Sequence, residues 1–398
     1  MSELVQLRKQ AVVPRRFALF DKGFRPLFLL AAVFAVGGVP AWILVRHAQL
    51  GVGDHLLPTV WHGHEMVFGF AAAVIAGFLL TAASNWTGRV TAVGAPLAML
   101  CVVWLAGRVA LVLGGRVDGH VIAITSLAFL PLVVIAVARP IFLAGSRRNY
   151  GLVVVLLALF GAQALTHAGA LSGSVAMQTL GPRLGVGLVI VVVLVIGGRV
   201  IPLFTRNATG AKDIASAPWL DRASIASAVA LVAADAASVR GVPLAVIAGG
   251  AALASLARAR RWGVQHTFGE PLLWVLHLGY LFVPLGFGLR AASALTPFVD
   301  VSSSLHALTT GAVGTLVLGM MARVSLGHTG RPLRAGRVLG IAFGLVIVAA
   351  LVRVIGPLAG ARAMAVDASA ALWTIAFGIY LVRVGPLLFW SRPDGKPG

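Results

Sequence analysis

Two histidines and a glutamate open the second long apolar stretch of the chain. His62, His64 and Glu65 lie within Trp61–Phe70, and apolar residues continue from there to Ala83. Ionisable side chains at the edge of a membrane are expensive and usually serve a function. His62 and His64 point about 200° apart on a helix, so we expect one to be an axial metal ligand and the other to serve a second centre or a supporting position. Glu65 could orient an imidazole or relay a proton.

A third histidine, His306, begins a later apolar stretch at nearly the same depth as His64. Two imidazoles at one level on two helices are what a bis-histidine haem b requires, and the small residues Gly69, Ala73 and Gly77 could lie beside the porphyrin ring. The alternatives are two separate histidines at the membrane surface and ordinary packing of small residues between helices. The pattern favours a haem held by His64 and His306.

Two more histidines lie toward the other side of the membrane. His277 is surrounded by apolar residues about 10 Å inside the membrane, where an imidazole needs a partner. His328 would stand about 33 Å from His306 along one helix, so these two cannot share a centre, whereas His277 and His328 could share a metal. Arg199 could bind a haem propionate through two parallel hydrogen bonds, or it could be a charge that sets topology. We expect the remaining histidines to be solvated near the surface: His47, His55, His120, His167 and His266.

The composition places these residues in an all-α polytopic membrane protein. Of the 398 residues, 59% are hydrophobic and 11% are charged, which is too little polar surface for a soluble domain. The apolar stretches are about 20 residues long, as a membrane-crossing helix requires. Twelve are predicted, at 24–45, 61–83, 91–113, 120–138, 151–170, 179–198, 219–238, 242–257, 270–292, 304–323, 338–356 and 365–385.

The formal net charge of +20 indicates a topology and not a nucleic-acid partner, because Lys and Arg lie singly or in small groups between the apolar stretches. Twelve crossings put both termini on one side, and about 24 of the 32 Lys and Arg then face that side. We expect one transmembrane domain over 1–398 with cytoplasmic termini, a basic segment at 1–23, a tail at 386–398 and no cleaved signal peptide. The residues assigned to the cytoplasmic side include Arg8, Lys9, Arg15, Arg16, Lys22, Arg25, Arg147, Arg148, Arg258, Arg260, Arg261, Arg331, Arg334 and Arg337.

A weak internal similarity links the second and tenth stretches. The spacing of His64, Gly69 and Gly77 recurs at His306 and two following glycines. Three units of four helices would also relate the sixth stretch, but that stretch carries Arg183 and no histidine. Because the chain contains 47 glycines, chance is the alternative explanation.

These segments resemble the NnrS family. The resemblance is carried by 61–82 with Asn85–Gly88, by Gly23–Phe28, by Gly198–Thr205, by 306–322 and by Ser325–Leu333, which together extend over nearly the whole chain. The family's usual His-Ala-His-Glu-Met is His-Gly-His-Glu-Met here, a departure that leaves both histidines in place.

The resemblance implies a multi-pass protein of the bacterial inner membrane that binds haem and copper and is associated with nitric oxide stress and denitrification. Haem-copper oxidases and related nitric oxide reductases hold a haem in the corresponding spans, an analogy of architecture only. Candidate metal ligands are His62, His64, His277, His306 and His328.

The leading functional expectation is a nitric oxide reductase, with Glu65 as proton relay and quinol as electron donor. The alternatives are a haem and copper protein that binds or senses nitric oxide without turnover, and a twelve-span transporter. The oligomeric state is left open.

Overall fold

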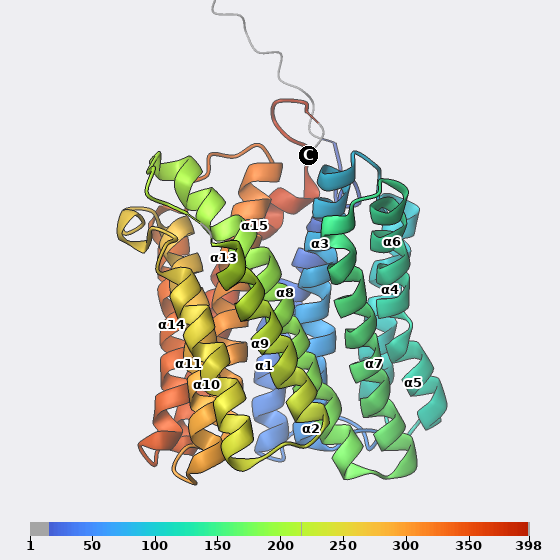
Figure 1. Cartoon of the computed structure of the whole chain (residues 1–398). Coiled ribbons are helices and arrows are strands. Elements are labelled where there is room, and N and C mark those ends of the chain that lie inside the picture. The colour runs from blue at the N-terminus through green and yellow to red at the C-terminus, as the bar shows by residue number, and fades with distance from the viewer. Residues whose placement is uncertain (1–15, 216, 397–398) are drawn as a thin grey trace, which may run out of the picture.

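The computed structural model describes residues 16–215 and 217–396. Within these ranges the chain forms a bundle of long, roughly parallel helices (Figure 1). Three residues assigned to the cytoplasmic side, Arg8, Lys9 and Arg15, and most of the basic segment 1–23 lie outside the described residues.

Each of the twelve expected spans coincides with one helix or with an unbroken run of helical segments. The α-helices are α1 (Phe24–Arg46), α2 (Pro58–His64), α3 (Ala72–Thr87), α4 (Ala95–Val112), α5 (Gly119–Leu127), α6 (Phe129–Leu143), α7 (Tyr150–Ser172), α8 (Val175–Thr209), α9 (Pro218–Ala236), α10 (Gly241–Ala259), α11 (Pro271–Leu295), α12 (Val301–His306), α13 (Thr315–His328), α14 (Gly336–Leu358) and α15 (Arg362–Phe389). Shorter segments are η1 (Glu65–Ala71), η2 (Arg147–Asn149), η3 (Val264–His266) and η4 (Ala307–Gly314).

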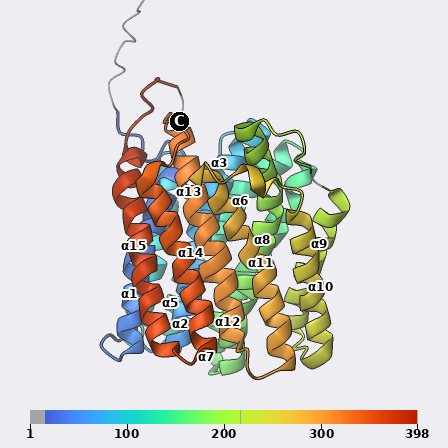
Figure 2. The ribbon, with the colours of Figure 1, turned by 90° about the vertical axis from the view of Figure 1, so that its left-hand side faces the viewer.

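Both ends of the described chain lie at the same end of the bundle. The N–H of Ala18 donates to the carbonyl of Phe389 over 2.8 Å, and that of Ser391 donates to Arg16 over 3.0 Å. We call this end the terminal face and the other, where α2 and α12 begin, the opposite face (Figure 2). Because the two chain ends meet, the number of crossings is even.

Helix α9 is the crossing with the weakest apolar signal. Eleven spans in the described residues are long and apolar enough to cross a membrane, and α9 is not among them. It nevertheless runs beside α10 along the bundle (Figure 1). Its acidic residues are paired with neighbouring helices: Asp221 with Arg258 of α10 and Asp235 with Arg290 of α11, each over 2.5 Å. These pairs make a less apolar helix compatible with a place in the bundle, and α9 brings the number of crossings to twelve.

Two spans change from α- to π-helical geometry directly after a histidine. Segment η1 follows His64, and η4 follows His306. Turns of π-helix are rare and often occur at functional sites. The similarity between the second and tenth stretches is therefore matched by the same local change in the backbone.

Candidate functional site

A cavity of about 410 Å³ lies between α1, α2, α8, α12, α14 and α15, toward the opposite face. Its volume falls within the range of small-molecule and cofactor sites. We call it the histidine cavity because His62 and His306 both line it. Most of the remaining wall is apolar, with Val186, Val313 and Trp373 among its residues.

The second, sixth and tenth spans all reach this cavity. They contribute His62, Arg183 and His306 respectively. Arg183, the residue that interrupts the repeat pattern in the sequence, thus lies in the same lining as the two histidines. The three spans that would correspond in a repeat of four helices therefore converge on one site.

Local structure around His306 leaves one of its ring nitrogens available. Asp300 caps α12 by accepting hydrogen bonds from the backbone N–H groups of Ser302 and Ser303, and it also pairs with Arg362. One turn later, Nδ1 of His306 donates to the carbonyl of Ser302 over 2.7 Å. The lone pair is then on Nε2, the nitrogen that would bind a metal.

His62 and Arg353 complete the polar part of the lining. The ring of His62 is stacked on Trp42, with centroids 4.6 Å apart and planes inclined by 13°. Arg353 of α14 donates to Ser302 Oγ over 3.1 Å. Its other terminal nitrogen, Nη1, is buried without a hydrogen bond to any described residue. An unpaired buried guanidinium nitrogen beside a cavity suits an anionic group on a ligand.

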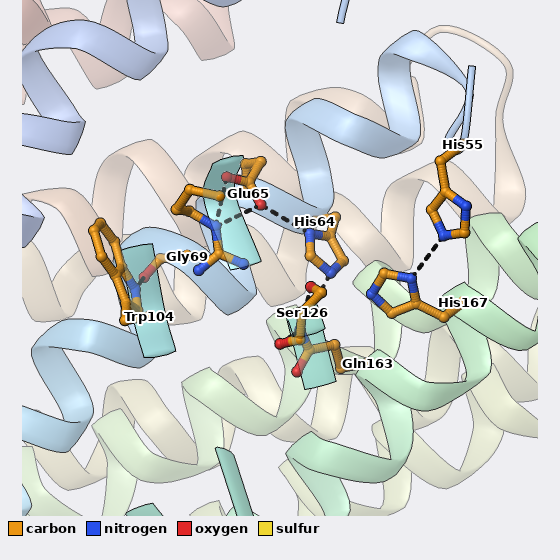
Figure 3. A network of polar contacts seen from close by, with 9 residues as sticks. His55, His64, Glu65, Gly69, Trp104, Ser126, Gln163 and His167 are labelled. Carbon is orange, nitrogen blue, oxygen red and sulfur yellow. Dashed lines mark hydrogen bonds and ion pairs between the residues drawn. The ribbon is translucent and has the colours of Figure 1, made fainter. Parts of the chain in front are cut away.

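His64 points away from the histidine cavity, as helical phase predicted for one of the pair. Its Nδ1 donates to Glu65 Oε1 over 3.0 Å, and its Nε2 accepts from the amide of Gln163 over 3.3 Å (Figure 3). That amide also donates to the carbonyl of Ser126 over 3.1 Å, which sets its orientation. Both nitrogens of His64 are occupied, so the partner of His306 in the cavity is His62 and not, as expected, His64.

The side chain of His64 belongs to a buried network that begins at a loop of the opposite face. Nε2 of His55 lies 2.9 Å from Nδ1 of His167, and the ring of His167 meets that of His64 edge-on at 5.0 Å (Figure 3). Glu65 continues the network to Arg108 of α4, whose Nε donates over 2.8 Å. The expectation that His167 is solvated is wrong: it is 1% exposed, because His55 supplies a hydrogen-bond partner. Burial lowers the pKa of His55 itself.

The glycines after His64 serve helix packing and not the cavity. A Cβ on Gly69 would lie 3.4 Å from Arg108 and 3.5 Å from Glu65, and one on Gly77 would lie 3.1 Å from Phe28 of α1. The residues after His64 that line the cavity are instead Met66, Val67, Phe70 and Ala71. Gly69, Ala73 and Gly77 are not in the lining of the histidine cavity, which agrees with the alternative that they serve ordinary packing between helices.

The remaining candidates lie toward the terminal face. His277 exchanges a hydrogen bond with Thr205 of α8 over 2.9 Å, whereas His328, the last residue of α13, lies against Phe24 of α1. Each histidine has its own neighbours, so the arrangement gives no support to a metal shared between them. Arg199 lies within α8, which continues to Thr209, and it lines a second cavity near the terminal face and not the histidine cavity.

A copper ion needs several ligand side chains that lie close together. In residues 16–215 and 217–396, no group of three or more His, Cys, Asp or Glu side chains is placed to hold a metal ion.

Sequence reasoning also missed Arg108 and Arg353. A signal was present, because each is a single charge inside an apolar stretch, and such charges usually face the bundle interior.

Comparison with known proteins gives one family. The family model described as NnrS protein matches residues 18–392. No curated protein matches the chain. The match extends over all twelve crossings and over both polar clusters described above.

Proposed function

The chain belongs to the NnrS family, and on that premise we propose that it binds a b-type haem and acts on nitric oxide. Family membership is consistent with a role in the response to nitric oxide. The observation that carries the proposal is the convergence of His62 and His306 on one cavity.

The residues of the histidine cavity fit a haem. A haem needs imidazole ligands, cations for its propionates and an apolar enclosure. His306 offers Nε2 because Nδ1 is bonded to a backbone carbonyl, and His62 lines the same cavity. Arg353, with its unpaired Nη1, and Arg183 would hold the propionates. An imidazole whose other ring nitrogen donates a hydrogen bond to a backbone carbonyl, as in His306, is a typical metal ligand.

Bound haem would supply an iron that coordinates nitric oxide and exchanges electrons. The reaction we propose is reduction of two NO by two electrons and two protons to N₂O and one H₂O. The buried network supports this reaction. Hydrogen bonds join His55 to His167 and His64 to Glu65, and a ring contact joins His167 to His64, so polar groups lead from near the surface to Glu65, the residue next to Met66 in the cavity wall. Glu65 is the candidate proton relay, and quinol is the proposed electron donor.

A second candidate is a protein that binds or senses nitric oxide without turnover. One observation favours it: His62 and His306 both line the cavity, and an iron that both imidazoles held would have less capacity to bind and turn over nitric oxide. We further propose that the protein resides in a bacterial inner membrane with the terminal face in the cytoplasm, because Lys and Arg concentrate at that end.

Optical spectroscopy of the purified full chain tests whether haem is bound. Measurement of nitric oxide consumed and nitrous oxide released tests the reaction. We expect a Soret band, and catalytic consumption of nitric oxide with release of nitrous oxide when a quinol is supplied. Uptake of nitric oxide that stops after one equivalent would contradict the proposed reductase activity and favour the second candidate, a binding protein. A preparation without a Soret band after reconstitution with haem would contradict both. Glu65→Gln should retain the Soret band while slowing turnover at least tenfold.

A further inference from the structure

A second cavity, of about 420 Å³, lies near the terminal face between η2, α8, α9 and α10. Four arginines and one aspartate are the charged residues of its lining, and no histidine is among the described residues that form it. We call it the arginine cavity; its arginines are Arg148, Arg199, Arg206 and Arg258. A site without an imidazole does not suit haem, so the position of Arg199 gives no support to the expectation that it binds a haem propionate.

Arg258 is built into the wall of this cavity. Its Nε donates to Asp221 over 2.5 Å and its Nη1 to the carbonyl of Leu194 over 2.8 Å. The guanidinium reaches this position only because residue 198 is glycine: a Cβ there would lie 1.5 Å from Nη2 of Arg258. Any side chain at position 198 would displace the guanidinium, so the glycine makes the room that Arg258 occupies against α8.

Arg199 is likewise held in one orientation. Its Nη1 donates to the side-chain oxygen of Asn149 over 2.7 Å, and its Nη2 donates to the carbonyl of Arg148 over 3.0 Å. Asn149 is buried and donates in turn to Ser146 over 2.9 Å. These bonds keep a charged group at the cavity where a free arginine would extend into solvent.

The charges of the arginine cavity are not balanced. Asp221 is the one acidic residue in the described lining and is paired with Arg258, so three positive charges have no counter-charge there. Arg148 and Arg206 are exposed and form no side-chain hydrogen bond with any described residue. Like charges that line one cavity repel each other, and an anion that enters the cavity would reduce this repulsion.

We propose that the arginine cavity binds a phosphate group, carried by an anionic phospholipid or free in solution. Planar guanidinium groups match phosphate oxygens through paired hydrogen bonds. The aliphatic residues Val195, Leu203 and Ile225 also belong to the lining and could contact an acyl chain below the headgroup. Basic pockets between transmembrane helices commonly take lipid headgroups. The site is independent of the haem and needs no nitric oxide chemistry.

Native mass spectrometry and calorimetry of the detergent-purified full chain test this site. One arm titrates phosphatidylglycerol, with phosphatidylcholine as the zwitterionic comparison, and the other titrates inorganic phosphate. The test variant is Arg148→Gln/Arg206→Gln, which removes two exposed charges. The matched control is Arg147→Gln, an exposed arginine of the same segment outside the lining.

We expect the double variant to weaken binding of phosphatidylglycerol, of inorganic phosphate or of both by at least tenfold, and the control to stay within twofold of the unmodified protein. Which arm responds identifies the source of the phosphate. Arg206→Gln alone should give an intermediate loss, and it serves if the double variant unfolds. Equal losses in Arg147→Gln, or binding unchanged by the test variants in both arms, would overturn the proposal.

Discussion

His306 donates its Nδ1 proton to the backbone carbonyl of Ser302, 2.7 Å away and one turn earlier in the same helix. A carbonyl can only accept, so the tautomer of the ring is determined by the fold and the Nε2 lone pair is left for a ligand. His64 has no such free nitrogen, because Glu65 and Gln163 engage both. This difference between His64 and His306 gives the ligand assignment a direct test.

We expect His62→Ala and His306→Ala each to abolish the Soret band of the purified protein, because each removes an imidazole from the histidine cavity. His64→Ala should retain the band. His120→Ala is the matched control, since that side chain is 75% exposed at the opposite face. Loss of the band in His64→Ala together with its retention in His62→Ala would show that the cavity has been assigned to the wrong histidine.

Arg353→Leu should accelerate loss of haem to apomyoglobin by about ten- to hundredfold, the equivalent of one charge-assisted hydrogen bond. The reason is the buried Nη1 of Arg353, which has no partner in the described chain and would pair with a propionate. The measurement is the rate of haem transfer followed optically. Arg116→Leu, at an exposed arginine of the same face, should leave the rate unchanged; a matching acceleration there would argue against a specific role for Arg353.

Removing Glu65 should destabilise the protein by roughly 3–5 kcal/mol, the usual cost of leaving a buried charge unpaired. Glu65 and Arg108 are 3% and 8% exposed, and their side chains join η1 to α4 over 2.8 Å. The measurement is the free energy of unfolding of Glu65→Leu in mixed detergent micelles. The double variant Glu65→Leu/Arg108→Met, which removes both charges, should recover most of the loss; additive losses would contradict the pairing.

Acidification should weaken the start of α12 through Asp300. Although burial raises the pKa of Asp300, Arg362 and the backbone N–H groups of Ser302 and Ser303 outweigh it and hold that pKa below its ordinary value of 3.8. A lowered pKa means that the contribution to stability is complete above pH 3.8 and is lost as the pH falls through the folded-state pKa. The unfolding temperature of Asp300→Asn should therefore fall less steeply below pH 3.8 than that of the unmodified protein; parallel curves would refute this.

Reporter fusions should place the loop after α9 on the side opposite to the chain ends. Alkaline phosphatase fused after Ala237 should be active in a bacterial host, and green fluorescent protein fused after Asp394 should fluoresce, because twelve crossings put these positions on different sides. The control is the reversed pair of fusions, which should both be silent. An inactive phosphatase at Ala237 would mean that α9 does not cross the membrane.

Much of the fold was predictable because crossing a membrane is a local property of the chain. The apolar stretches of the sequence located all twelve crossings, α9 by the weakest signal, and the phase of a helix separated His62 from His64. The limits of helix α8 were not predictable: the apolar signal ends at Gly198, yet α8 continues to Thr209 past Pro202. This longer helix carries Arg199 into the arginine cavity.

By itself, the sequence determined the membrane class, the even number of crossings and the two directions in which His62 and His64 point, since each depends on residues near one another in the chain. Only the tertiary structure decided which direction meets His306. That outcome depends on how α2 and α12 are rotated against α8 and α14, and on the π-helical turns that follow His64 and His306. Packing of distant helices sets such rotations, so the His-Gly-His-Glu turn serves the histidine cavity through His62 and the buried network through His64.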